Sequence, residues 1–418
     1  MRGLMGIVVA VLGGLGALAP AAGASAPAQP ALAYVTGGDS GVSYVWVADS
    51  SGGYARKLGK GDSPLLSPNG LMVAAVDVGS SDHALTLYPT TAETTTVYPT
   101  TAETPTGGTP TAETPTGGRA TGYFGATTAA DAVAWSPDSR YLAVELMGDN
   151  APSLSGYGLA IIDTETGTEQ MIAKGVIYGA GFEPGTSDTL VYARASSLSA
   201  TAATNIFTVA ADGTGTTQIT TDGRDAAPVW GTRGIAFVHE RLRKGYAPLG
   251  QIWLMQPNGS DRKQITHISV GLLAEGLVPL AFSADGTRLA AEYEGEDTAI
   301  GYSVSVLTGH ATQLKVGNQA VSAWGISADG RSVLISVGGF EQPASRAKIE
   351  RIPFSGGHPT PLIAHGNYPS WNLYGRPGVR RQANSQARGA RPARPIHGDL
   401  ASSRAVASAT TSAWQTVV

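Results

Sequence analysis

The 418-residue chain contains no cysteine. It therefore has no disulfide framework and cannot be processed as a lipoprotein, so its stability must come from packing. Hydrophobic residues make up 42% of the chain, which is ample for a globular core. After the N-terminal region, no segment of ten or more residues shows helical periodicity, which indicates a protein close to all-β.

The familiar signatures of catalytic and cofactor sites are missing as well. No Walker loop, zinc-finger pattern, His-Glu-x-x-His motif or dinucleotide fingerprint occurs. No Gly-x-Ser-x-Gly elbow stands at a strand–helix junction, which argues against an α/β-hydrolase. The seven histidines never fall at metal-ligand spacing. Sequence motifs therefore predict no resident cofactor.

Long apolar runs are confined to the first residues. Arg2 precedes an apolar run over Ile7–Leu18, and Ala22-Gly23-Ala24 follows it. This pattern predicts a signal peptide over 1–24 and a short leader over 25–31, because the apolar run is too short to span a bilayer. No later run is long enough to cross a membrane. We expect an exported protein, extracellular or in the periplasm and cell envelope, that is soluble after cleavage.

The chain contains a repeated sequence motif, which we call the phrase. In its clearest copy, Ala132–Val144, an apolar run ends in an aromatic residue, Ser-Pro-Asp-Ser forms a turn, and an alternating run follows. Proline presets φ for a turn and Asp-Gly or Asn-Gly supplies the bend, so each copy is typical of a β-hairpin. The other copies are LLSPNGLMVAAV (Leu65–Val76), AGFEPGTSDTLVYA (Ala180–Ala193), PVWGTRGIAFVH (Pro228–His239), LAFSADGTRLAAEY (Leu280–Tyr293) and WGISADGRSVLIS (Trp324–Ser336).

A second hairpin with a glycine-bearing turn accompanies the phrase, as in Ile206–Gly223 and Ile252–Thr266. Two hairpins per repeat give four antiparallel strands, which is one blade of a β-propeller. The residues that end the first strands recur every 44–52 residues after an enlarged first interval, and we expect them to pack between blades. They are Leu66, Trp135, Phe182, Trp230, Phe282, Ile326 and Trp371.

The two ends of the repeat region complement each other. Residues 32–61 predict three strands without a preceding first strand, whereas Asn367–Asn372 predicts a first strand without followers. We therefore predict that the C-terminal strand completes the N-terminal blade and closes the ring. The predicted fold is an all-β propeller of four-stranded antiparallel blades over residues 32–374. Seven blades are favoured, and six are the alternative.

Two segments depart from the repeat. Residues 88–118 repeat Pro-Thr-Thr-Ala-Glu-Thr and Thr-Pro-Thr-Gly-Gly units, which predicts a disordered insert that suits either O-glycosylation or a neutral expansion. Residues 375–418 contain seven arginines and one acidic residue, which predicts a disordered basic tail. The tail suits an acidic polymer of the cell envelope better than a nucleic acid, and a solvated tail without a partner is the alternative.

The phrase Trp135-Ser136-Pro137-Asp138 resembles the WD40-like Pro-Asp repeats of TolB-type propellers. The turn Asp212-Gly213 and the closing Gln218-Ile219-Thr220 are similar to that family as well. The resemblance covers Leu32–Trp371 and implies a periplasmic or extracellular propeller that often binds proteins at its channel mouth. TolB itself carries an α/β domain before its propeller. Only a leader precedes the first strand here, so we do not expect TolB proper.

Polar residues recur where each first strand begins, which should be one mouth of the central channel. The candidate site residues are Asp62, Asp131, Asp225, Asn318 and Asn367. Most stand four or five positions before the end of the strand, and Asn318 follows a closing glycine in the same way. Together they form either an oxygen-rich mouth for a calcium ion or a basic peptide, or a set of turns that each side chain closes locally.

The function that the sequence favours is an exported, non-enzymatic, monomeric scaffold that binds a protein, peptide or other ligand at the channel mouth. The rival is a propeller hydrolase or lyase, lactonase-like or acting on a polysaccharide, that uses channel carboxylates and a metal. No histidine falls at the candidate position in the sequence, which gives the enzyme less support.

Overall fold

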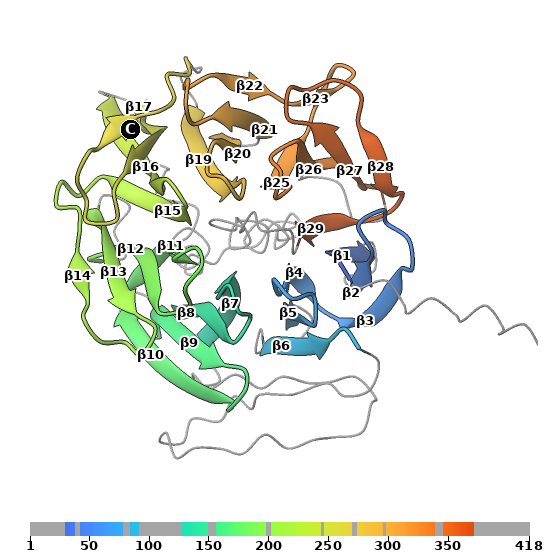
Figure 1. Ribbon diagram of the computed structural model, residues 1–418, viewed down its shortest axis with the longest axis horizontal. Helices are drawn as coiled ribbons and strands as arrows, with labels where there is room; N and C mark the ends of the chain where they lie inside the picture. Colours follow the sequence, from blue (N-terminus) through green and yellow to red (C-terminus); the bar gives the residue numbers. More distant parts are fainter. Residues whose placement is uncertain are drawn as a thin grey trace, which may run out of the picture.

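The computed structural model describes residues 30–37, 42–77, 84–91, 128–148, 156–197, 202–243, 246–269, 274–295, 298–338 and 346–371. These residues form strands and turns, and the strands lie in small sheets around a ring (Figure 1). No helix of the described ranges has the length and hydrophobicity of a membrane span. The predicted signal peptide, most of the predicted insert and the basic tail lie outside these ranges. The predicted all-β propeller is confirmed.

Three of the sheets have four antiparallel strands in chain order, as a propeller blade does. The first contains β7 (Thr128–Trp135), β8 (Tyr141–Gly148), β9 (Gly158–Asp163) and β10 (Thr168–Lys174). The second contains β11 (Val176–Phe182), β12 (Thr189–Ala195), β13 (Thr204–Ala210) and β14 (Thr217–Gln218). The third contains β25 (Ser322–Ile326), β26 (Ser332–Val337), β27 (Lys348–Pro353) and β28 (Thr360–Ile363).

Two further sets of four strands are joined by one parallel pairing between Gly250 and Gly276. The first set is β15 (Asp225–Gly231), β16 (Gly234–Arg243), β17 (Tyr246–Met255) and β18 (Lys263–Gln264). The second set is β19 (Ala274–Phe282), β20 (Arg288–Gly295), β21 (Thr298–Ser305) and β22 (Ala311–Gln313). A short hairpin of β23 (Lys315–Val316) and β24 (Gln319–Ala320) precedes β25.

The sheet next to the predicted insert has three described strands, β4 (Asp62–Leu66), β5 (Met72–Asp77) and β6 (Ala84–Pro89). The structure corrects the start of the insert, because Tyr88 and Pro89 belong to β6. Tyr88 is buried, and its hydroxyl donates a hydrogen bond to the Lys60 carbonyl oxygen at 2.5 Å. An aromatic side chain with core and hydrogen-bond partners favours the strand over a solvated loop.

The last described strand lies beside the first. β29 (Asn367–Trp371) pairs with β1 (Leu32–Gly37), and β2 (Ser43–Ala48) and β3 (Arg56–Lys60) complete that sheet. The pairing is antiparallel and sets Leu32 opposite Trp371. This is the contact that the closure prediction requires, and the two strands lie side by side in Figure 1. Seven blades, with six as the alternative, stays a prediction.

The core lies between neighbouring sheets. All seven predicted strand-ending residues are buried. Trp135, for example, packs with Leu65, Leu87 and other apolar residues of the adjacent sheet, and its indole N–H donates to the Leu65 carbonyl oxygen at 3.0 Å. Each large side chain at this position therefore joins its own sheet to the preceding one.

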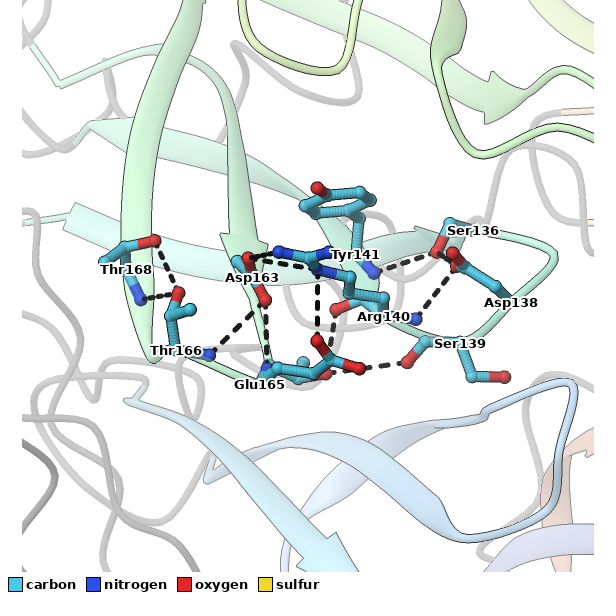
Figure 2. Close-up of polar contacts among 10 residues, drawn as sticks. Ser136, Asp138, Ser139, Arg140, Tyr141, Asp163, Glu165, Thr166 and Thr168 are labelled. Atoms are coloured by element: carbon cyan, nitrogen blue, oxygen red, sulfur yellow. Dashed lines mark hydrogen bonds and ion pairs between the residues drawn. The ribbon is translucent and has the colours of Figure 1, made fainter.

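The repeated Ser-x-Asp phrase closes the turn between the first two strands of a sheet. Ser136 Oγ donates to Asp138 Oδ1 at 2.5 Å, and the same oxygen accepts the Arg140 N–H at 3.1 Å (Figure 2). Ser136 Oγ also accepts the Tyr141 N–H at 2.8 Å. The same pattern recurs in the turns that begin at Ser67, Ser283 and Ser327. The serine and aspartate of the phrase therefore stabilise the turn. Their presence predicts a hairpin and does not indicate a functional site.

Candidate functional site

Four of the five predicted site residues lie in strands near the centre of the ring. Asp62, Asp225 and Asn367 begin β4, β15 and β29, and Asp131 lies in β7 (Figure 1). Asn318 instead lies in the exposed turn between β23 and β24. The expectation that Asn318 shares the position of the others is therefore wrong. The extra hairpin precedes β25, so Ser322 begins that strand.

Asp62 and Asn367 satisfy their own turns. Asp62 Oδ1 accepts the N–H of Ser63 at 2.7 Å, and Asn367 Oδ1 accepts the N–H of Tyr368 at 2.9 Å. Ser63 and Tyr368 both adopt positive φ angles, 57° and 49°. An adjacent side-chain acceptor helps to hold a non-glycine residue in this region. For these two positions the local turn explains the residue type.

Asp131 instead faces a second carboxyl group. It lies directly opposite Glu145 in the pairing of β7 with β8. Asp131 is buried, and Glu145 is half-buried. Burial, followed by the charge of Asp131, raises the pKa of Glu145 from its ordinary 4.5 to about 8. With its pKa raised to about 8, the Glu145 carboxyl group holds its proton at neutral pH.

Tyr178 and Glu240 extend this pair across the two neighbouring sheets. Burial raises the pKa of Tyr178 in β11 to about 12, and the nearby charges of Glu145 and Glu240 add to the shift. Burial also raises the pKa of Glu240 in β16 to about 7. We call Asp131, Glu145, Tyr178 and Glu240 the acidic band. It joins three successive sheets, and burial raises the pKa values of Glu145, Tyr178 and Glu240 within it.

Asp225 belongs to a charge-compensated cluster beside Glu240, whose pKa the Asp225 charge raises and the His239 charge lowers. Its carboxylate is fully buried and lies 2.8 Å from His239 Nδ1. Arg262 Nη2 donates to both Asp225 oxygens at 2.8 and 2.9 Å and lies 3.1 Å from Asp222 Oδ2. The Phe237 ring lies 5.3 Å from the Arg262 guanidinium carbon, and the Trp253 ring lies 4.9 Å from the imidazole. The cluster joins the turn before β18 to the start of β15.

This cluster also has the donor set of a metal site. Ligand atoms of Asp222, Asp225 and His239 lie within 4.8 Å of one another. Arg262 Nη2 already lies among them, however, so a divalent ion would meet a guanidinium at close range. Calcium also prefers oxygen ligands to imidazole. The geometry therefore fits an ion-pair cluster better than a resident metal, and a calcium ion in the channel stays a prediction.

His239 is the residue that sequence reasoning missed. Gly231 and Gly234 pair at the tight turn between β15 and β16, and a bulge between Ala226 and Val229 shifts the register by one. Counting outward from the turn without the bulge sets His239 opposite Ala226 instead of Asp225. The hairpin could be predicted from the sequence, and it brings His239 close to the start of β15. The bulge that sets His239 opposite Asp225 could not be predicted, because the sequence pattern does not show it.

The raised pKa of Glu145 predicts a pH-dependent stability. A carboxyl group whose pKa is higher in the folded state contributes stability that is complete below pH 4.5 and is lost as the pH rises through about 8. Glu145→Gln should therefore flatten the fall in melting temperature between pH 5 and pH 9 and raise it above wild type at pH 9. Thermal melts at several pH values test this, with the exposed Glu165→Gln as the control. Equal pH slopes for wild type and Glu145→Gln would contradict it.

Comparisons with known proteins point to the same fold. No protein-family model and no curated protein matches the chain. Among solved structures, TolB from Acinetobacter baumannii is 14% identical, with a TM-score of 0.44 over 82% of this chain and 66% of that one. A puromycin-hydrolyzing peptidase from Mycobacterium tuberculosis is 17% identical, with a TM-score of 0.50 over 80% and 54%. An oligogalacturonate lyase in complex with manganese is 12% identical, with a TM-score of 0.46 over 84% and 86%.

These identities are all below 25%, so the likeness supports the propeller fold and no activity. The chain spans less than two thirds of the length of the TolB and peptidase structures. The resemblance to TolB-type propellers inferred from Trp135-Ser136-Pro137-Asp138 is confirmed at this level.

Proposed function

We propose that this protein is an exported, non-enzymatic propeller scaffold whose acidic band binds a basic segment of a protein or peptide. The observation that carries the proposal is the Asp131–Glu145 pair. Glu145 has a strongly raised pKa, and within the described part of the chain no positive charge lowers it. Asp225, by contrast, already has Arg262 and His239 as partners. A cationic side chain would supply at Glu145 the charge that Arg262 supplies at Asp225.

The binding step follows from the protonation of the band. Below pH 8 Glu145 is mostly protonated, and Glu240 is half protonated near pH 7. An ammonium or guanidinium group favours the ionised carboxylates, so binding releases protons and affinity rises from pH 7 to pH 9. The charges of Glu145 and Glu240 both act on Tyr178, so its hydroxyl would supply a neutral donor or acceptor near the cation.

The test is calorimetric titration of the full chain with an acetylated, amidated tri-arginine peptide. We expect saturable binding that weakens at least tenfold in Asp131→Asn and Glu145→Gln. Glu165→Gln, which removes an exposed carboxylate beside Arg140, is the matched control and should bind like wild type. Calcium alone is the second probe, and it separates a cation site from a peptide site. Binding that is indifferent to both band variants would overturn the proposal.

A second candidate function is catalysis by His239. His239 Nδ1 lies 2.8 Å from the buried Asp225 carboxylate and 3.4 Å from Arg262 Nη2. In the tautomer that donates from Nδ1 to Asp225, Nε2 is the basic nitrogen, which is the arrangement of a general base. Elimination or hydrolysis at a saccharide or amide would use such a base, and the peptidase and lyase named above share the fold. Turnover of oligogalacturonate or puromycin that disappears in His239→Ala would favour this function. No turnover by wild type would remove it.

A further inference from the structure

A cavity of about 510 Å³ lies at the opposite ends of the inner strands from the acidic band. It opens between the β11–β14 sheet and the β15–β18 sheet. Its walls are formed by Glu183 and Pro184 after β11, Trp230 and Arg233 around the end of β15, and Gln256 after β17. The volume falls in the range of about 300–1,000 Å³ that is usual for sites of small ligands.

The cavity arises where the repeated phrase is degenerate. Five residues, Ser136–Arg140, separate β7 from β8, but only Thr232 and Arg233 separate β15 from β16. The copy PVWGTRGIAFVH lacks the serine and aspartate that close the longer turn. Trp230, Arg233 and the residues of this shorter turn line the cavity.

The two charged groups of the cavity are held by neighbouring structure. Arg233 Nε donates to the Asp285 carbonyl oxygen at 3.2 Å, and Thr232 Oγ1 donates to the Ala284 carbonyl oxygen at 3.3 Å. On the other side, Glu183 Oε2 accepts from Thr186 Oγ1 at 3.2 Å. Within the described ranges, neither Arg233 nor Glu183 takes part in an ion pair. Both keep most of their hydrogen-bonding capacity for a ligand.

We propose that this cavity binds a zwitterion, namely a short peptide with free termini. The ammonium group would pair with the Glu183 carboxylate, and the carboxylate would accept hydrogen bonds from the remaining N–H groups of Arg233. An apolar side chain would lie against Pro184 and Trp230. The proposal is independent of the acidic band, because the two sites share no residue.

The experiment is calorimetric titration of the full chain with alanyl-phenylalanine, its N-acetylated form and its C-terminal amide. We expect saturable binding of the free dipeptide and at least tenfold weaker binding of each blocked form. Arg233→Gln should bind the free and amidated forms equally, and Glu183→Gln should bind the free and acetylated forms equally. These changes of preference assign each charge to one end of the ligand.

Two controls keep the test decisive. Arg331→Gln alters an exposed arginine in the turn between β25 and β26 and should bind like wild type. Thermal melts of Arg233→Gln and Glu183→Gln check folding, and we expect both variants to fold because Arg233 is exposed and Glu183 is half-buried. Absence of saturable binding by wild type, or an unchanged preference for the free dipeptide in Arg233→Gln, would overturn the proposal.

Discussion

Deletion of residues 367–418 should abolish cooperative folding, whereas deletion of 375–418 should leave the melting temperature nearly unchanged. The longer deletion removes β29, which pairs with β1 and whose Ser370 Oγ accepts the Leu66 N–H at 3.1 Å. It also removes Trp371 from a buried cluster with Leu32 and Leu334. The shorter deletion leaves every described strand and contact intact.

The expected loss of stability after deletion of β29 is large because this strand joins the two ends of the chain. Removing one large core aromatic costs about 3–5 kcal/mol on its own, and the whole fold is stable by about 5–15 kcal/mol. Loss of β29 also exposes the edge of β1 to solvent and to other chains. Circular dichroism melts of both truncations measure the difference. Equal damage from the two deletions would contradict closure of the ring by β29.

Trp230→Ala should cost about 3–5 kcal/mol of the free energy of unfolding. The Trp230 side chain is 7% exposed and packs with residues of two sheets. Its apolar neighbours include Val191 and Ile206 of the preceding sheet and Phe237 and Met255 of its own. An alanine would leave a cavity there, since strands on both sides are held by their own pairing and cannot close the gap.

Urea unfolding of wild type and Trp230→Ala measures this cost. Leu307→Ala is the control, because Leu307 is 64% exposed and its truncation should change stability by about 0.5 kcal/mol or less. A loss below about 1 kcal/mol for Trp230→Ala would be typical of a surface residue. It would mean that Trp230 does not join the two sheets.

Much of the fold could be predicted because each repeat carries its own signals. The turn phrase locates hairpins, alternation gives the strands, and an aromatic such as Trp135 marks the contact between sheets. The strand that completes the N-terminal sheet could be predicted because Asn367–Trp371 repeats the first half of the phrase. Local patterns and the overall architecture agree over these segments.

The failures occur where the repeat is irregular. The β23–β24 hairpin displaces Asn318 from the strand position, and nothing in its short sequence distinguishes it from a closing turn. The bulge in β15 brings His239 opposite Asp225, and the partner of Asp131 is Glu145 on the next strand. The sequence comparison aligned only the first strand of each repeat, so it identified Asp225 and Asp131 but not their partners. The partners His239 and Glu145 lie on the second strands, and the pairing register of the two strands determines which residues face each other.

The two proposed sites differ in their physical character. The acidic band spans three sheets, with Asp131 buried and its other members half-buried. Burial raises the pKa values of Glu145, Tyr178 and Glu240, so the band suits a cationic segment of a larger partner. The cavity beside Arg233 is lined by opposite charges and by Trp230, so it suits a small ligand. Tri-arginine with blocked ends and an uncharged-side-chain dipeptide with free ends therefore distinguish the two sites.

The most direct measurement of the central claim is the number of protons released when the blocked tri-arginine peptide binds at pH 7. Titrations in two buffers with different ionisation enthalpies give this number. The acidic band predicts net proton release from Glu145 and Glu240, and a smaller release in Glu145→Gln. Binding without proton release, or with the same release in Glu145→Gln, would place the peptide elsewhere and contradict the account.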